Sequence, residues 1–416
     1  MIVVKYNQLI KKMKKLIIIS SLNFDNYLFK RYQIENYIKK ENLNVECWRL
    51  KFLDKKIKDK NNKLFQLSLK EESLKKNIVR IFSYNELIKY LRKNKNNFFV
   101  YDLNFFERNI LVLILFKIYG AKFIFHNGTT NIPIIKFNLS DYKKIFFGNT
   151  YSNSSNSLIF ATLNFLNNFV KSKFRKVLAP KLDIFFSNGL TEKIISKSIS
   201  KKNIDLHPYD YDSYIMEKNS IKKRIIDKEY ILLLDQGYPV PYDNIFSKER
   251  PLTTELNYKK NIVKLLRSFQ LKFPQKKIVV ALHPKSSRQN FYGFESFEYM
   301  TPHLVKFSSF ILSHDTLSIQ LAALWNKPTL LLTSNDLKRR ISKKKCIQWF
   351  ADKLNLPIVN IDSFDEQSLN GTLEKILSEN DRIDTYNKFI ENYIKSNHPA
   401  KIYRSVSETI ANEISE

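Results

Sequence analysis

Short runs of β-branched and aromatic residues alternate with helix-length amphipathic segments along the whole chain, and this alternation limits the possible folds most. The first half contains runs such as KLIIIS at 15–20 and NFFVYDL at 97–103, and the second half contains YILLLDQG at 230–237 and KIVVALHP at 277–284. Apolar strands separated by helices are typical of βαβ units, in which parallel strands form a sheet covered by helices. We therefore expect an α/β protein with two Rossmann-like, doubly wound domains that face a cleft.

The length of 416 residues is sufficient for two or three domains of ordinary size. The charged stretch MEKNSIKKRIIDKE at 216–229 precedes a new apolar strand and marks the best boundary. The resulting prediction is an N-terminal domain over 1–220, a C-terminal domain over 221–385, and helices over 386–416 that pack back on the domains. Residues 138–181 contain no clear strand, and we interpret them as an insertion facing the cleft or a membrane.

The chain is strongly basic, with a formal net charge of +30 and a sequence pI near 9.7. Such a charge attracts phosphates, an anionic membrane surface or nucleic acid. The two cysteines, Cys47 and Cys346, are far apart and form no CxxC spacing, which argues against both a disulfide framework and a zinc site. These features and the absence of a recognisable secretion signal favour the cytoplasm.

Two segments are markedly hydrophobic, but neither has the roughly 20 nearly uncharged residues that a membrane span needs. Segment 109–125 is interrupted by Lys117 and Gly120, and segment 157–170 contains three asparagines. The second segment is followed by the basic sequence KSKFRKVLAPK at 171–181. An apolar helix with a basic flank can lie in a membrane interface, while a core helix with a solvated end has the same pattern.

Asp235 follows an apolar strand, and Gly237 and two prolines come directly after it. A carboxylate at the end of a strand can act as a general base that takes the proton of an attacking hydroxyl. An aspartate in this position can equally hold its own turn by accepting backbone N–H bonds. The sequence leaves both roles open.

His283 and Pro284 end the next strand-like run, and Lys285, Ser286, Ser287 and Arg288 follow. Pro284 biases His283 towards an extended backbone, which directs the imidazole to the rim of the sheet. The side chains behind it are donors suited to phosphate oxygens. His207 and His398 also precede proline, so the strand before His283 and the donors after it are what indicate an anion site here.

A third polar cluster, SHDTLS at 313–318, follows the apolar run SSFIL and precedes a helical pattern. We expect an amphipathic helix with Leu317, Leu321 and Leu324 on one side. The N–H groups at the start of such a helix, together with the side chains of Ser313, His314, Thr316 and Ser318, are suited to bind an anion. Serine, aspartate and threonine are also ordinary N-caps.

Two weaker patterns remain. Asp210 and Asp212 have the D-x-D spacing of a divalent-metal site, although a turn and helix cap explains them better. FIFHNGTTNIP at 123–133 ends a strand with His126, Asn127 and Thr129, which either line the acceptor side of a cleft or form a turn. The sequence contains no GxxxxGK[ST], GxGxxG or HExxH motif, and we expect neither a metal nor a cofactor.

The motifs at 235–237, 283–284 and 313–318 together resemble those of bacterial GT-B glycosyltransferases that use CMP-sugars, namely sialyltransferases, polysialyltransferases and Kdo transferases. The resemblance implies that Asp235 is the base, that His283 and Pro284 contact the CMP phosphate, and that Gly237, Lys285 and the 313–318 cluster help to bind the nucleotide. Gln236 stands where those enzymes have a second acidic residue, and Ser313 with Thr316 replaces paired serines.

The resemblance implies an inverting, metal-independent transfer of a sialic acid-like sugar or Kdo to a capsule, lipooligosaccharide or O-antigen acceptor at the inner face of the cytoplasmic membrane. The alternatives are a GT-B transferase using a UDP- or GDP-sugar, a CDP-glycerol-type phosphotransferase, and a GT-A transferase using Asp210 and Asp212. A basic nucleic-acid-binding protein is the alternative from another class. The scattered basic residues and the lack of a recognised module argue against nucleic acid.

Overall fold

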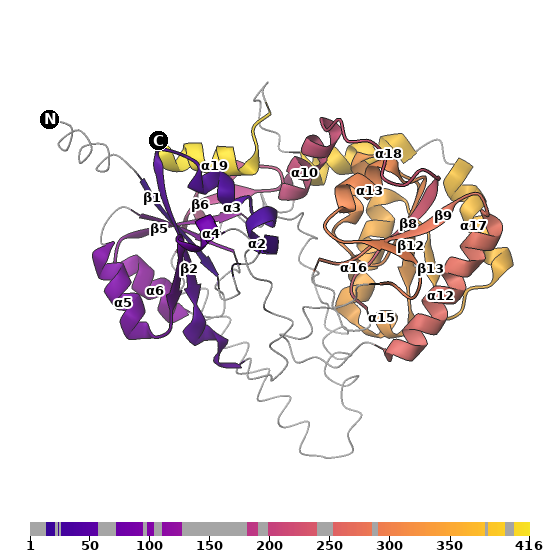
Figure 1. Ribbon diagram of the computed structural model, residues 1–416, viewed down its shortest axis with the longest axis horizontal. Coiled ribbons are helices and arrows are strands. Elements are labelled where there is room, and N and C mark those ends of the chain that lie inside the picture. The colour runs from indigo at the N-terminus through magenta and orange to yellow at the C-terminus, as the bar shows by residue number, and fades with distance from the viewer. Residues whose placement is uncertain are drawn as a thin grey trace, which may run out of the picture.

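The computed structural model describes residues 14–20, 24, 26–56, 72–94, 98–103, 110–126, 181–189, 199–238, 253–284, 290–378, 382–395 and 403–416. In these residues the chain forms two lobes, each built on one parallel β-sheet, and the lobes lie side by side (Figure 1). None of the helices in the described ranges is long and apolar enough to cross a membrane.

The N-terminal sheet has seven strands in the order β3-β2-β1-β4-β5-β6-β7. The strands are β1 (Lys14–Ser20), β2 (Leu43–Leu50), β3 (Ile78–Ile81), β4 (Phe98–Asp102), β5 (Ala121–His126), β6 (Leu182–Ser187) and β7 (Ser200–Asp205). The helices of this lobe are α2 (Asn26–Arg31), α3 (Ile34–Ile38), η1 (Lys51–Lys56), α4 (Glu72–Lys75), α5 (Tyr84–Lys93) and α6 (Ile110–Ile118).

The central strand β1 shows why this sheet is covered on both faces. Leu16 and Ile18 are fully buried in one hydrophobic cluster, and Ile17 and Ile19 are fully buried in another. Alternate side chains of a strand point to opposite faces, so the apolar run serves two cores at once. The edge strand β7, with the sequence SKKNID, is polar and partly exposed, as expected at an unpaired edge.

The C-terminal sheet has six strands in the order β10-β9-β8-β11-β12-β13. They are β8 (Tyr230–Leu234), β9 (Lys277–Ala281), β10 (Glu295–Phe297), β11 (Phe310–Ser313), β12 (Thr329–Thr333) and β13 (Ile358–Asn360). The accompanying helices are α12 (Glu255–Lys272), α13 (Thr301–Phe307), α14 (Ile319–Leu324), α15 (Asn335–Arg339), α16 (Ile341–Leu354), α17 (Glu366–Ser378), α18 (Arg382–Phe389) and η4 (Ile390–Ile394).

The two sheets have the same winding. In each, the first three strands run outward in one direction and the later strands continue on the other side of the first, so the order reverses between β1 and β4 and between β8 and β11. This is the doubly wound arrangement, in which ligands bind beyond the carboxyl ends of the strands at the reversal. The expectation of two Rossmann-like parallel sheets is confirmed.

The helix α10 (Tyr209–Lys218) contacts both lobes, and the last helix lies on the N-terminal one. Helix α10 follows β7, and Tyr209 lies in the core of the N-terminal lobe, while the Tyr214 ring lies 4.8 Å from Trp325 of the C-terminal lobe. The last helix, α19 (Val406–Ser415), returns to the N-terminal lobe, where Val406 and Ile410 are fully buried. The boundaries near 220 and 385 stay predictions, and residues 138–180 lie outside the described ranges.

Candidate functional site

The three polar clusters recognised in the sequence lie after three neighbouring strands of the C-terminal sheet. Leu234, the last residue of β8, pairs with Ala281 of β9 on one side and with Ser313 of β11 on the other. Asp235, His283 and His314 therefore follow adjacent strands at the same edge of the sheet. This edge includes the reversal between β8 and β11, where a ligand is expected in this fold.

Asp235 joins the first two clusters through backbone donors. Its carboxylate accepts hydrogen bonds from the Gly237 N–H at 2.9 Å and from the His283 N–H at 3.3 Å, and the residue is only 5% exposed. Gly237 has a φ of 74°, a left-handed conformation that favours glycine. These contacts are those of an aspartate that holds a turn, and its role as a base stays a prediction.

The side chain of His283 is half-buried at the rim, and the loop behind it is fixed by the Tyr299 hydroxyl, which donates to the Pro284 carbonyl at 3.2 Å. His283 thus keeps part of its surface exposed at this edge. Lys285, together with residues 286–289, lies outside the described residues, so the structure does not test these donors.

A second pair of contacts joins the loops after β8 and β11. The Tyr238 hydroxyl donates to the Asp315 carboxylate, and both side chains are buried. The other carboxylate oxygen of Asp315 lies 2.6 Å from the Lys343 ammonium, at the beginning of α16. The loops around the strand ends are thus held together by side chains that the sequence patterns did not single out.

His314 is completely buried and has a partner on each ring nitrogen. Nδ1 lies 3.1 Å from the Leu332 carbonyl, to which it must donate, and Nε2 lies 3.1 Å from the Tyr258 hydroxyl. Burial lowers the pKa of the imidazole to about 4, so it is neutral near pH 7. In this arrangement the ring connects α12 to β12 inside the core.

The other members of the 313–318 cluster also bind within the loop. The Ser313 hydroxyl donates to the His314 carbonyl at 3.1 Å, and the Thr316 hydroxyl accepts from the Ser318 N–H at 3.3 Å. The predicted amphipathic helix is wrong in one respect, because α14 has six residues and all of them are buried. The helix is covered by its own lobe and by α10, and nucleotide binding by this cluster stays a prediction.

Residues of the N-terminal lobe approach this edge, which the sequence did not indicate. Asp210 accepts a hydrogen bond from Gln320 of α14 at 2.6 Å and lies 3.8 Å from the guanidinium of Arg31 on α2. On the same helix, the Lys30 ammonium lies 5.9 Å from the ring centre of Tyr299, whose hydroxyl holds the Pro284 loop. Asp210 of α10 thus links the helix that follows β1 to the helix that follows β11.

Asp210 and Asp212 have different partners in the structure. Asp210 faces Gln320 and Arg31, whereas Asp212 faces His207 at 2.7 Å, because residues two apart on a helix point in different directions. In the described ranges no group of three or more potential metal ligands occurs. The predicted helix cap is wrong, because α10 has Pro208 at its N-cap and no side-chain cap bond.

His126, the described member of the predicted acceptor-side group, lies in a buried polar network at the end of β5. Its Nε2 faces two acceptors, the Asn188 side-chain oxygen at 2.9 Å and the His207 carbonyl at 3.1 Å, so this nitrogen carries the hydrogen. Burial lowers the pKa of His126 to about 4. Asn127 and Thr129 lie outside the described residues, and the acceptor-side role stays a prediction.

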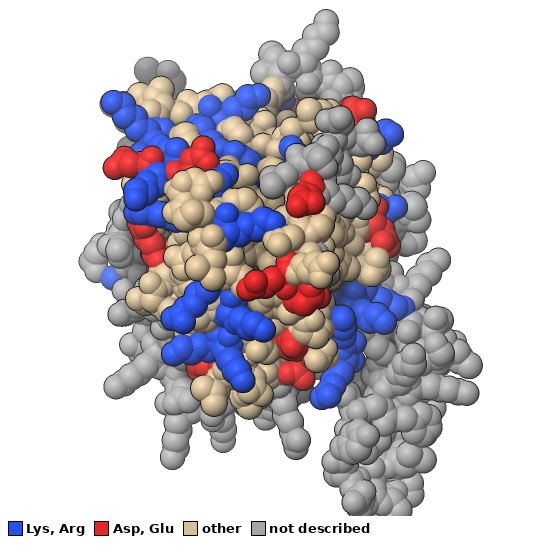
Figure 2. Space-filling model, turned by 90° about the vertical axis from the view of Figure 1, so that its right-hand side faces the viewer, with Lys and Arg blue, Asp and Glu red and all other residues tan. Residues whose placement is uncertain are grey.

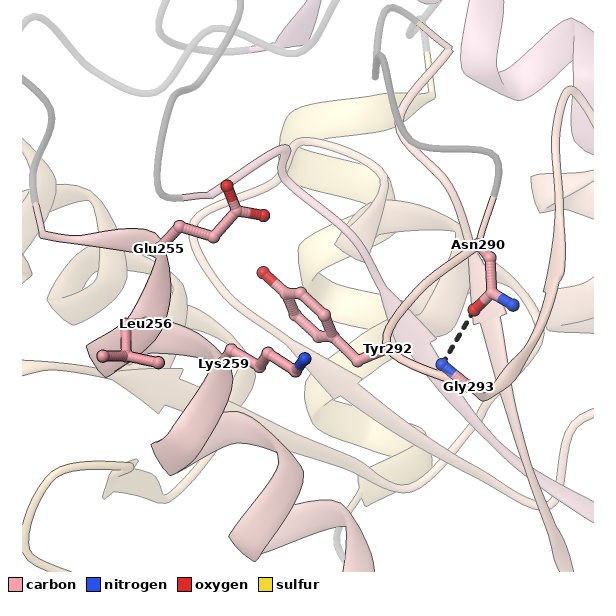
Figure 3. A pocket seen from close by; sticks show the side chains of 6 residues that line it. All are labelled: Glu255, Leu256, Lys259, Asn290, Tyr292 and Gly293. Carbon is pink, nitrogen blue, oxygen red and sulfur yellow. Dashed lines mark hydrogen bonds between the residues drawn. The ribbon is translucent and has the colours of Figure 1, made fainter.

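We call the edge of the C-terminal sheet that carries Asp235, His283 and His314 the candidate edge. A pocket of about 700 Å³ opens beside it, between the first turn of α12 and the loop before β10 (Figure 3). Lys259 lies 5.6 Å from the ring centre of Tyr292, and the Asn290 side chain accepts from the Gly293 N–H at 2.8 Å. In Figure 3 the Glu255 carboxylate and the Tyr292 hydroxyl point toward the same space. The pocket presents an aromatic ring and both charge signs to a ligand.

No protein-family model matches the chain, and no curated protein matches its sequence. Among solved structures, the S. aureus MnaA–UDP co-structure is 15% identical with a TM-score of 0.50, and the match covers 97% of this chain and 96% of that one. A UDP-GlcNAc 2-epimerase from Methanocaldococcus jannaschii is 12% identical with a TM-score of 0.47, covering 96% and 99%. Acinetobacter baumannii MurG is 8% identical with a TM-score of 0.45, covering 96% and 99%.

At these identities the likeness shows the fold alone. The match to the MnaA structure extends over nearly the whole chain, so it supports the two-domain α/β architecture of the GT-B type rather than a single shared domain. The class of fold is thereby established, and the activity has to be argued from the candidate edge itself.

Proposed function

We propose that this chain is a GT-B glycosyltransferase that moves a sugar from a nucleotide sugar, a CMP-sugar in the first instance, to a bacterial surface glycan. The observation that carries the proposal is the position of Asp235, His283 and the 313–318 cluster after adjacent strands at the reversal of the C-terminal sheet. The order and residue types of these motifs resemble those of CMP-sugar enzymes. The proposed sugar is sialic acid-like or Kdo.

In the proposed reaction the acceptor hydroxyl attacks the anomeric carbon from the face opposite the phosphate. The new glycosidic bond forms while the bond from the anomeric carbon to the phosphate oxygen breaks, and that oxygen keeps the electron pair. His283 offsets the charge that develops on the phosphate, and the hydroxyl proton goes to Asp235. Because protein groups supply the charge, the proposed transfer needs no metal and no further cofactor.

A UDP-sugar is the main competing donor, because the similar MnaA structure was solved with UDP. Thermal-shift measurements with CMP, CDP, UDP and GDP distinguish a CMP-sugar donor from a UDP-sugar donor. A ligand at one hundred times its Kd stabilises a protein by about 2.7 kcal/mol, which is readily detected. We expect CMP to raise the unfolding temperature. If UDP stabilises the protein and CMP does not, the donor is a UDP-sugar rather than a CMP-sugar.

The base needs a separate test, because the Asp235 carboxylate already accepts two backbone hydrogen bonds. The substitution Asp235→Asn keeps the size and one acceptor oxygen but removes the charge. If Asp235 is the base, turnover falls by about 10²–10⁴-fold while nucleotide binding persists. A variant that loses only stability, with turnover per folded molecule unchanged, would make Asp235 a turn-holding residue.

The proposed acceptor is a glycan or a lipid-linked glycan at the inner face of the cytoplasmic membrane. An anionic membrane is a better partner for the basic surface than nucleic acid. On the outer face of the C-terminal lobe, basic side chains are interspersed with acidic and uncharged ones rather than gathered in one stripe (Figure 2). Salt-dependent retention of DNA or RNA by the wild type, unchanged by His283→Ala, would revive the nucleic-acid alternative.

A further inference from the structure

The helix α6 is unusual because it is apolar on both sides. Its nine residues, ILVLILFKI, include one charged side chain, Lys117, which forms an ion pair with Asp183 at 3.2 Å. A helix at the surface of a globular protein normally has an apolar stripe toward the core and a polar face toward water. An outward face made of aliphatic residues needs an explanation.

The two sides of α6 can be told apart by their exposure. Val112 and Phe116 are fully buried against the sheet, and the Phe116 ring lies 6.0 Å from that of Trp48. Leu111 and Ile118, seven residues apart and hence on one face, are 63% and 68% exposed. Ile114, between them, is half-buried. The outward stripe of α6 is therefore leucine and isoleucine in contact with solvent.

The neighbouring helix α5 supplies positive charge beside this stripe. Both helices pack on Trp48, whose ring lies 5.7 Å from Tyr90 of α5, and they lie next to each other on the outer side of the N-terminal lobe (Figure 1). Lys89, Arg92 and Lys93 are exposed in the last two turns of α5. The surface of α5 and α6 thus combines exposed aliphatic side chains with a cluster of cations.

We propose that the α5–α6 surface docks on an anionic membrane. Exposed aliphatic side chains enter the boundary between headgroups and acyl chains, and adjacent cations bind anionic headgroups. An uncharged partner would not use the cations, and a nucleic acid would not use the aliphatic stripe. This inference rests on the proposed function in one respect: the proposed acceptor is linked to the membrane on which this lobe docks.

The position of the surface suits such an acceptor. After α6 the chain turns at Gly120 and continues into β5, which ends at His126. At about 3.3 Å per residue, the six residues of β5 span roughly 20 Å. Docking through α6 therefore places the carboxyl-end edge of the N-terminal sheet within reach of a glycan that extends from a lipid.

The test is sedimentation of the full-length protein with vesicles of phosphatidylcholine alone and of phosphatidylcholine with phosphatidylglycerol. We expect binding to the anionic vesicles, weakened by high salt. Leu111→Ser with Ile118→Ser should reduce the partition coefficient by about tenfold or more per side chain removed from the membrane. Arg92→Ser with Lys93→Ser should reduce it by roughly fivefold per cation.

The C-terminal lobe offers matched controls. Leu256 and Leu271 of α12 are 75% and 80% exposed, and Lys260 and Arg267 of the same helix are exposed cations. Serine at either pair should leave vesicle binding unchanged. None of the four α5–α6 substitutions lies at the candidate edge. Stabilisation by nucleotide and turnover of a soluble acceptor should therefore stay unchanged in these variants. These two measurements test the proposed function separately from membrane docking.

Three outcomes would overturn the docking surface. The first is a wild-type protein that does not bind anionic vesicles at low salt. The second is binding that the α12 substitutions reduce as much as those on α5 and α6. The third is a wild-type dimer in analytical ultracentrifugation that dissociates on Leu111→Ser with Ile118→Ser, without vesicle binding, which would assign the surface to a second copy of the chain.

Discussion

The two lobes have the same strand winding but use the carboxyl ends of their strands differently. In the C-terminal lobe, hydrogen bonds between neighbouring loops hold the edge together, and His283 is half-buried at its rim. In the N-terminal lobe, the corresponding edge carries His126, His207 and Asp212, which are all buried. His126 bonds to the His207 carbonyl, and the His207 ring bonds to the Asp212 carboxylate. The C-terminal edge keeps a half-buried histidine at its rim, whereas the described polar side chains after β5 and β7 of the N-terminal edge bond within the protein.

The difference shows that a polar strand end does not by itself identify a ligand site. The Asp212 carboxylate accepts from His207 at 2.7 Å, from Gln33 at 2.7 Å, from the Val406 N–H at 2.9 Å and from the Tyr403 hydroxyl. These donors belong to the helix region near α3, the end of β7 and the C-terminal segment. The N-terminal edge therefore serves to fasten α10 and α19 to the sheet.

Asp212→Ala should have the largest effect on stability. The substitution leaves several buried donors without an acceptor, and each buried donor left unsatisfied typically costs about 1–3 kcal/mol. Although burial opposes ionisation, the hydrogen bond from His207 helps to hold the pKa of Asp212 below its usual value, so the carboxylate is charged near pH 7. Urea unfolding followed by far-UV circular dichroism measures the loss.

Asp210→Ala is the matched control, two residues earlier on the same helix. The Asp210 side chain keeps 16% exposure and has Gln320 and the more distant Arg31 as partners, so a smaller loss is expected. Equal losses for the two variants would show that the fastening role of Asp212 is wrong.

Most of the fold follows from the sequence, because alternating apolar strands and helices specify parallel sheets almost independently of detail. Fully apolar runs such as LIII at 16–19 and YILLL at 230–234 are visible without coordinates. The partners of Asp212 are not visible, because Gln33, Tyr403 and Val406 are separated from it by 179, 191 and 194 positions. No local pattern relates such distant residues.

The next test compares His283→Ala with His207→Ala, since both histidines precede proline and the dipeptide alone does not distinguish them. Replacing the half-buried His283 should reduce turnover by about 10²–10³-fold, as expected when a preorganised donor at a developing charge is removed. The buried His207, bonded to Asp212, should affect stability instead. Turnover of a CMP-sugar and unfolding in urea are measured for both variants.

If the two variants behave in the same way, the strand ends of the two lobes do not differ in their roles. A His283→Ala protein that unfolds early but turns over normally when folded would make this histidine structural as well. A His207→Ala protein that is fully stable but inactive would place a ligand at the N-terminal edge.

The candidate site was only partly predictable for a related reason. The strand ends could be found from the apolar runs, and their adjacency follows from the doubly wound order. The backbone bonds of Asp235, the inward orientation of His314 and the approach of Lys30 to Tyr299 depend on packing between distant segments. A sequence pattern gives the residue type at a strand end, while burial decides whether its side chain faces a ligand or the core.

The pH dependence of stability tests whether the two lobes share one property, a buried neutral histidine at a strand end. Burial lowers the pKa values of His126 and His314 to about 4. The unfolded imidazole titrates near pH 6.5, so between these values the unfolded chain binds protons that the folded chain does not, and stability must fall as pH falls from about 6.5 to 4. At pH 5 each histidine should cost about 2 kcal/mol relative to pH 7.

Replacing each histidine by a residue that does not titrate shows which lobe loses stability between pH 7 and pH 5. His126→Gln retains a donor in the place of Nε2–H, and His314→Asn retains one in the place of Nδ1–H, so each keeps the hydrogen bond to a carbonyl. Each variant is expected to lose some stability at pH 7 but to show a smaller decrease between pH 7 and pH 5, by about 2 kcal/mol. If only one variant flattens the profile, the buried imidazole of the other lobe titrates normally, and the resemblance between the two strand ends is limited to their position in the fold.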